Sequence, residues 1–216
     1  MTIAPRTLRH TTPGARDLIV LLPGAYMTPE DFVAAGFFAA VDRQDLAIDV
    51  IVVDFDLESI SGGHALPMLQ QHILAPAREH GYQRLWLGGI SLGGLLSLCH
   101  VADTPGCVDG LCLLAPYPGS RLTINAIDRA GGLDAWTPEG GQLDDPEFRM
   151  WRWLQRPPAA FPVFVGYGRD DRFAKGMQCI AERFPAADRL AVPGGHDWPA
   201  WQLLWEHFLA SAYLRR

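Results

Sequence analysis

The sequence predicts an α/β fold, with a mostly parallel central sheet flanked by helices. Short apolar runs of strand length recur along the chain. They are continuous rather than alternating, as in strands buried on both faces of a parallel sheet. Segments with a helical pattern lie between these runs, so strand and helix alternate and right-handed crossovers are expected. The expected strands cover 18–23, 49–54, 84–89, 110–115, 162–166 and 189–193.

Helices are expected between and after these strands. The first begins at Pro29, a residue type suited to a first helical turn, directly after Thr28. Pro67 and Pro76 interrupt the second helix and leave its limits open. Residues 1–16 are expected to add an antiparallel edge strand. The expected helices cover 29–41, 64–80, 92–102, 174–184 and 198–214.

A long connection over 117–160, rich in Gly, Pro and Asp, breaks this alternation. Within it, 146–156 is expected to form a short helix that Asp145 caps and Pro157 ends. Long insertions in compact domains are commonly functional, so the segment is interpreted as a small cap over the site. The alternative is a helix that only covers the edge of the sheet. Residues 1–216 are expected to form a single domain. The expected helix over 146–156 carries apolar residues on more than one face: Phe148, Met150, Trp151, Trp153 and Leu154.

Composition restricts the possible function classes. Of the 216 residues, 49% are hydrophobic and 19% are charged, which is ordinary for a globular protein. The net charge is −6 and no Lys/Arg cluster forms a basic face, so nucleic acid is not an expected partner. The amino-terminal segment lacks an apolar signal region, and no apolar run is long enough to cross a bilayer. A cytoplasmic protein without a membrane partner is therefore expected, and its oligomeric state is left open.

The cysteines form no C-x-x-C pair and are interpreted as buried free thiols. Their spacing gives no zinc-ligand pattern, so no metal site is expected. They are Cys99, Cys107, Cys112 and Cys179.

Ser91 is the candidate nucleophile, in the G-x-S-x-G pattern at 89–93. In this pattern a sharp turn between strand and helix lifts the serine hydroxyl above the sheet. Glycines two residues to either side remove side chains that would clash. The required context is present, because a strand-like run precedes the pattern and a helix-like run follows it. The alternative is a glycine-rich turn that binds nothing.

His196 is the candidate base, since a serine hydroxyl is a poor nucleophile at neutral pH without one. It follows the last expected strand, at the edge of the sheet where α/β proteins place their ligands. Gly194 and Gly195 before it let the backbone bring the ring inward. His64, after the second strand, is the reserve base, although a solvated turn histidine is the simpler interpretation.

An aspartate is expected to orient the base. Asp170 and Asp171 both follow the fifth strand, and Asp171 is preferred because its spacing from the preceding glycine suits a chain turning back over the strand end. Arg169, Arg172 and Lys175 lie around these acids. They would attract an anionic substrate, although a solvated surface explains them equally well.

On these residues the chain resembles the α/β-hydrolase superfamily over nearly its whole length. Ser91, Asp171 and His196 occur in the family's order, and the strand count is similar. The resemblance implies the α/β-hydrolase fold, a Ser–His–Asp triad, an acyl-enzyme intermediate and no cofactor.

The resemblance also implies an oxyanion hole formed by two backbone N–H groups. One belongs to Leu92, directly after the nucleophile. The other lies in the turn after the first strong strand and is assigned to Ala25, with Tyr26 as the alternative. This chain has Pro23-Gly24 where many members have His-Gly, which leaves the choice of donor open.

The expected function is hydrolysis of a carboxylic ester, with His196 taking the Ser91 proton and passing it to the leaving alcohol. Thioesterase or amidase activity on the same triad is the alternative within hydrolases. A non-catalytic binding protein of the same fold is the alternative from another class. A dinucleotide-binding fold is disfavoured because 88–93 does not match G-x-G-x-x-G. The expected ligand is a small ester or thioester, contacted by Tyr26, Trp151 and Trp198.

Overall fold

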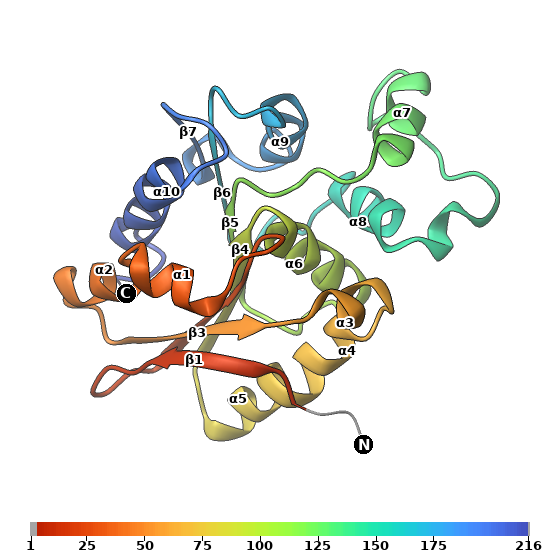
Figure 1. Ribbon diagram of the computed structural model, residues 1–216. Coiled ribbons are helices and arrows are strands. Elements are labelled where there is room, and N and C mark those ends of the chain that lie inside the picture. The colour runs from red at the N-terminus through yellow and green to blue at the C-terminus, as the bar shows by residue number, and fades with distance from the viewer. Residues whose placement is uncertain (1–3, 216) are drawn as a thin grey trace.

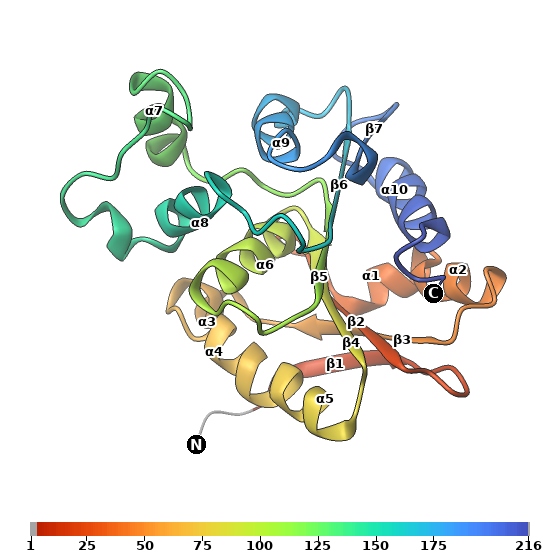
Figure 2. The same cartoon turned by 180° about the vertical axis from the view of Figure 1, so that it is seen from behind.

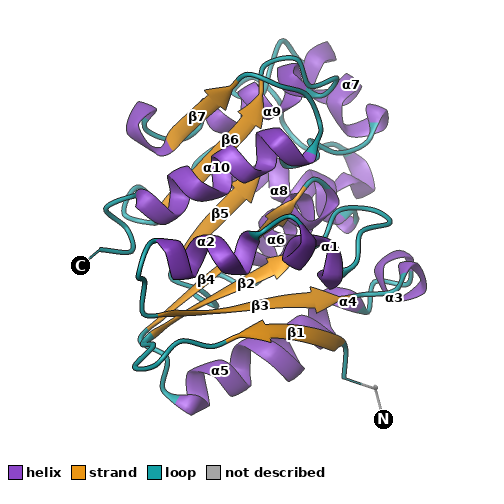
Figure 3. Ribbon diagram, turned by 60° about the vertical axis from the view of Figure 1, so that its left-hand side comes forward, coloured by secondary structure: helices purple, strands orange, loops and turns teal. Residues whose placement is uncertain are grey.

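A computed structural model describes residues 4–215, in which seven strands form one sheet of order β1-β3-β2-β4-β5-β6-β7 (Figures 1 and 3). All neighbouring pairs are parallel except β1 with β3, so the expected antiparallel edge is confirmed. Each of the six apolar runs forms a strand within two residues of its expected limits. The strands are β1 Arg6–His10, β2 Asp17–Leu22, β3 Ile48–Asp54, β4 Arg84–Ile90, β5 Gly110–Leu114, β6 Val163–Gly168 and β7 Arg189–Val192.

The helices follow the expected alternation with two changes. The helix expected over 29–41 is divided into α1 (Pro29–Ala34) and α2 (Phe37–Arg43), because Gly36 between them adopts a left-handed φ of 78°. The helix expected over 64–80 is continuous but irregular. It runs through α4 (Ala65–Leu69), the π turn η1 (Gln70–Leu74) and α5 (Ala75–His80). The wider π turn comes just before Pro76, which has no N–H to donate to the preceding turn.

Three further helices lie close to their expected limits: α6 (Leu92–Asp103), α9 (Ala174–Ala181) and α10 (Trp198–Ala210). The sequence analysis missed α3 (Leu57–Ser61) and α7 (Arg121–Arg129). Both begin at a side-chain cap, since Asp56 accepts from the backbone of Ser59 and Ser120 accepts from that of Thr123.

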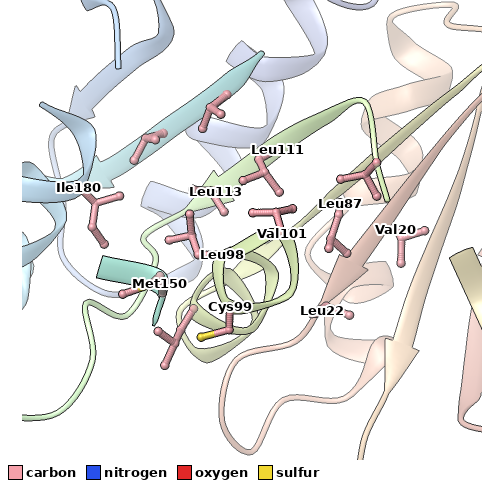
Figure 4. Packing of buried hydrophobic residues seen from close by; sticks show 14 of the residues in the cluster. Val20, Leu22, Leu87, Leu98, Cys99, Val101, Leu111, Leu113, Met150 and Ile180 are labelled. Carbon is pink, nitrogen blue, oxygen red and sulfur yellow. The ribbon is translucent and has the colours of Figure 1, made fainter. Parts of the chain in front are cut away.

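The strands supply two apolar cores, one on each face of the sheet. Along β2, Leu18, Val20 and Leu22 face the core that includes α6 and α8, whereas Ile19 and Leu21 face the core that includes α1, α2 and α10. Figures 1 and 2 show these helices on opposite sides of the sheet. Figure 4 shows the first core, where Leu98 and Val101 of α6 lie among strand residues. Burial on both faces explains why the strands read as continuous apolar runs.

The insertion at 117–160 folds into α7, the 3₁₀ turn η2 (Gly140–Asp144) and α8 (Pro146–Leu154). It lies beyond α6, on the side of the sheet away from α10 (Figures 1 and 2). Gln155 holds it together by donating to the carbonyls of Leu133 and Trp136, and Arg149 pairs with Asp103 of α6. Its role as a cap stays a prediction.

The thiols match the expectation only in part. Cys99 and Cys112 are buried and Cys107 is half-buried, but Cys179 is exposed, so its expected burial is wrong. All four are free, and burial raises the pKa of the Cys112 thiol well above its ordinary value. Within residues 4–215, no helix is both long enough and apolar enough to cross a membrane.

Candidate active site

Ser91 lies at the sharp turn between β4 and α6 and has a positive φ of 52° with ψ −112°, outside the usual allowed regions of the backbone. Three backbone hydrogen bonds fix this conformation. The Ser91 N–H donates to the carbonyl of Leu114 at 3.1 Å, and the Ser91 carbonyl accepts from Tyr117 at 2.9 Å and from Leu95 at 3.1 Å. A non-glycine residue is strained in this region and stays there only when its surroundings dictate it. The turn therefore presents the hydroxyl in a fixed position.

The glycines flanking Ser91 allow two backbones to touch. A Cβ at Gly89 would lie 2.2 Å from the Leu22 carbonyl oxygen, and one at Gly93 would lie 1.9 Å from the same oxygen. Both distances are far below van der Waals contact, and the obstacle is backbone that cannot rotate away. The end of β2 is thus packed directly against the nucleophile turn, and only glycine fits at these two positions.

The loop after β7 brings His196 to Ser91. The His196 Nε2 lies 2.8 Å from Ser91 Oγ, although 105 residues separate them in the chain. Gly168 lets this loop cross the end of β6, because a Cβ there would lie 2.3 Å from the Gly194 carbonyl oxygen. Asp197 caps α10 by accepting from Ala200 and also accepts from Gly195, which ties the loop to the start of that helix.

Asp171, rather than Asp170, contacts the imidazole. The Asp171 Oδ2 lies 2.5 Å from His196 Nδ1, and its Oδ1 accepts from the Phe173 N–H at 2.8 Å. The Asp171 side chain is fully buried, whereas Asp170 is exposed and accepts from the Gly194 N–H at 3.4 Å. A carboxylate can only accept, so Nδ1 carries the proton and Nε2 is free to accept from the Ser91 hydroxyl.

Two aromatic rings that the sequence analysis did not single out hold the imidazole. Phe173 lies 5.5 Å from His196 between ring centroids at an interplanar angle of 81°, and Trp201 lies 5.2 Å from it at 89°. Tyr117 packs edge-on against Phe173, and the Arg172 guanidinium lies 4.7 Å from the Phe173 ring centre. Sequence alone could not find these rings, because Phe173 and Trp201 resemble any aromatic residue at the start of a helix.

The turn after β2 approaches the nucleophile from the other side. A Cβ at Gly24 would lie 3.4 Å from the Ile90 carbonyl oxygen, so this turn lies against the residue before Ser91. In the described residues the backbone N–H groups of Ala25 and Tyr26 donate to no protein acceptor. Either group is therefore available to a ligand together with that of Leu92, and the choice between them stays a prediction.

A cavity of about 220 Å³ lies beside this turn. It is lined by residues 22–28 after β2, by residues 55–57 and Ile60 after β3, and by Leu96 of α6. The backbone N–H of Ser59 lowers the pKa of Asp56 at the cavity wall, so this carboxylate stays ionised at neutral pH. Tyr26 lines the cavity with its side chain 88% exposed. The Tyr26 side chain therefore does not pack against the start of α1.

The structure places the other candidate side chains outside the triad. The expectation for Trp151 is corrected: its ring is 1% exposed in the core, and its indole N–H donates to the Pro118 carbonyl. Trp198 packs edge-on against Phe32, Phe37 and Trp201 and does not line the cavity, so its contact with a ligand stays a prediction. The side chain of His64 is exposed, and His196 occupies the place beside Ser91. The cations Arg169, Arg172 and Lys175 are exposed.

No family model and no curated protein matches the chain, but solved structures do. The fluorophosphonate-binding serine hydrolase F of Staphylococcus aureus matches with a TM-score of 0.64 and 12% identity, over 97% of this chain and 84% of that one. The monoacylglycerol lipase of Paleococcus ferrophilus matches with a TM-score of 0.59 and 14% identity, over 96% of this chain and 98% of that one. A predicted CIB-like hydrolase from Thermoplasma acidophilum matches with a TM-score of 0.57 and 18% identity, over 94% of this chain and 87% of that one. At these identities the likeness is one of fold, and the chain has the α/β-hydrolase fold.

Proposed function

We propose that this protein is a serine hydrolase that cleaves carboxylic esters through an acyl-enzyme on Ser91. The observation that carries the proposal is the continuous hydrogen-bonded chain from Ser91 Oγ through His196 to Asp171, assembled from three loops at the carboxyl ends of β4, β6 and β7. Structural relatives described as a monoacylglycerol lipase and as serine hydrolases support the same chemistry.

The first half of the reaction forms the acyl-enzyme. His196 Nε2 accepts the Ser91 proton as Oγ bonds to the ester carbonyl carbon, and the carbonyl oxygen becomes an oxyanion. Asp171 stabilises the imidazolium that forms. The N–H of Leu92, at the amino end of α6, and that of Ala25 stabilise the oxyanion. The carbon–oxygen bond of the ester then breaks, and Nε2 gives its proton to the departing alcohol.

The second half releases the acid. Water attacks the acyl-enzyme carbonyl while His196 Nε2 takes a proton from it, and a second oxyanion forms in the same place. That intermediate collapses, Ser91 Oγ leaves with the proton held on Nε2, and the carboxylic acid is released.

Labelling with a fluorophosphonate probe, beside hydrolysis assays, tests this chemistry. We expect the folded protein to be labelled on Ser91 at neutral pH and to hydrolyse 4-nitrophenyl esters. Ser91→Ala and His196→Ala should each reduce kcat by roughly 10⁴-fold or more. Hydrolysis rates on matched ester, thioester and anilide substrates show which leaving group the enzyme prefers. An active wild type whose Ser91→Ala variant kept its rate would overturn the proposal, and absence of labelling would favour a binding protein.

The two neighbouring aspartates offer a matched pair of variants. Asp171→Asn leaves the imidazole without an anionic partner and favours the wrong tautomer, so kcat should fall by roughly 10³–10⁴-fold. Asp170→Asn changes an exposed side chain, so its kcat should stay within about threefold of the wild type. Equal losses in the two variants would contradict the assignment of Asp171.

A further inference from the structure

The cavity beside the β2–α1 turn has a defined position relative to the base. The nucleophile follows β4, and β2 and β3 lie on one side of β4 in the sheet, whereas β6 and β7 lie on the other. The cavity walls follow β2 and β3. The base and its carboxylate follow β7 and β6. The cavity and the base His196 therefore lie on opposite sides of Ser91.

This arrangement decides which half of an ester enters the cavity. The leaving oxygen must come within hydrogen-bonding reach of His196 Nε2 to receive its proton, so the alcohol points toward the β6–β7 side. The acyl carbon bonds to Ser91 Oγ, with its oxygen at the N–H groups of Leu92 and the β2–α1 turn. The rest of the acyl group then extends toward β2 and β3, where the cavity begins.

The lining of the cavity suits a neutral apolar chain. Apolar surface comes from the partly exposed side chains of Met27, Phe55, Leu57, Ile60 and Leu96. Leu57 is 51% exposed and Tyr26 is 88% exposed, so a bound chain would remove apolar area of both side chains from water. The ionised carboxylate of Asp56 opposes an acyl chain that ends in a second carboxylate.

The volume of the cavity limits the length of that chain. An apolar protein cavity of roughly 150 Å³ holds one benzene molecule, which has six carbons. On the same scale, a cavity of about 220 Å³ holds an apolar chain of about eight or nine carbons. A long-chain lipid acyl group would extend beyond it into solvent.

Building on the proposed ester hydrolysis, we propose that this cavity is the acyl-binding site and that it selects neutral acyl groups of short to medium length. Ile60, on the surface helix α3, lines the cavity from a different segment than the β2–α1 turn, and it is assigned as the residue that sets the length limit.

Kinetics on 4-nitrophenyl esters from acetate to palmitate test the length limit. For the wild type we expect kcat/KM to be highest between butyrate and octanoate and to fall at least tenfold by laurate. Ile60→Trp fills the cavity, so octanoate hydrolysis should fall at least tenfold while acetate hydrolysis stays within about threefold. Leu143→Trp, at an exposed leucine on η2 outside the cavity, should leave the chain-length profile unchanged. Equal losses for acetate and octanoate in Ile60→Trp would overturn the assignment.

Binding separates the cavity from the chemistry. Octanamide, which mimics the acyl half of a substrate, should bind the Ser91→Ala protein in isothermal titration calorimetry and bind at least tenfold more weakly when Ile60→Trp is added. If octanamide binds but no ester is hydrolysed, the cavity remains the acyl-binding site and the proposed ester hydrolysis is rejected. Ester hydrolysis with octanamide binding unaffected by Ile60→Trp would keep the function and reject the cavity.

Discussion

The two sides of the candidate active site are held in place by different kinds of contact. On the nucleophile side, backbone packs on backbone, and Gly89 and Gly93 admit the Leu22 carbonyl. On the base side, a glycine also lets the His196 loop cross β6, but the orientation of the imidazole ring depends on the side chains of Phe173 and Trp201. The position of the hydroxyl is thus fixed by chain geometry, whereas the angle of the imidazole is fixed by packing.

This difference predicts how each side responds to substitution. Backbone contacts cannot relax, so an added methyl group displaces whole segments. Side-chain packing can relax, so a smaller apolar side chain beside His196 loosens the orientation of the imidazole without unfolding the protein. The following measurements sharpen or break this comparison.

The largest effect is expected at Gly93. Gly93→Ala places a methyl group 1.9 Å from the Leu22 carbonyl oxygen. We expect a loss of about 3 kcal/mol or more in the free energy of unfolding, which lowers Tm by roughly 6–12 °C in a domain of this size. The matched control is Gly195→Ala, since a methyl group there meets Asp197 at 3.4 Å, an ordinary contact. Its Tm should change by less than about 4 °C. Similar Tm losses in both variants would break the comparison.

An intermediate effect is expected at Phe173. Phe173→Leu keeps an apolar side chain, and the backbone N–H that holds Asp171 is unaffected, but the ring contact with His196 is lost. An aromatic pair contributes roughly 0.5–1.5 kcal/mol, so kcat should fall about 2- to 13-fold with little change in KM. Because the imidazole environment changes, the pH profile of kcat should shift as well.

Phe161→Leu is the control for Phe173→Leu. Its ring packs edge-on against Trp153 just before β6, at the opposite end of the strand from Asp171. Phe161→Leu should lose about as much stability as Phe173→Leu, whereas its kcat should stay unchanged. A Phe173→Leu enzyme with wild-type kcat and pH profile would show that the ring does not position the base.

The smallest effect expected is a pH dependence of stability on the nucleophile side. His100, buried in α6 and hydrogen-bonded to Gln70, has its pKa lowered by burial, whereas in the unfolded chain its pKa is about 6.5. Between these two values the unfolded chain binds more protons. The free energy of unfolding therefore falls as the pH drops below about 6.5, by at most about 1.4 kcal/mol per pH unit, and this contribution is complete above that pH.

Thermal unfolding of the wild type and His100→Gln at pH 8.0 and 5.0 checks this expectation. The Tm advantage of the wild type should be larger at pH 8.0 than at pH 5.0. A constant difference would show that His100 does not titrate on unfolding.

Local patterns were sufficient to predict the sheet and the nucleophile turn. Strands buried on both faces must be apolar throughout, so 18–23 and 84–89 could be recognised without knowing their neighbours. The turn at Ser91 could be recognised from the G-x-S-x-G pattern between a strand-like and a helix-like run. The Leu22 carbonyl that excludes larger residues at 89 and 93 lies on the neighbouring strand β2. The expected order of nucleophile, acid and base followed from the position of each loop after a strand.

Tertiary structure alone decided which side chains meet. Asp170 and Asp171 are chemically identical, and only the path of the chain after β6 turns one toward His196. Trp151 is as apolar as any substrate-binding aromatic residue, yet it is buried in the core, where its indole N–H donates to the Pro118 carbonyl. Phe173, Trp201 and the cavity walls come from segments far apart in the chain. Their contact depends on how the helices pack on the sheet, which no local pattern in the sequence encodes.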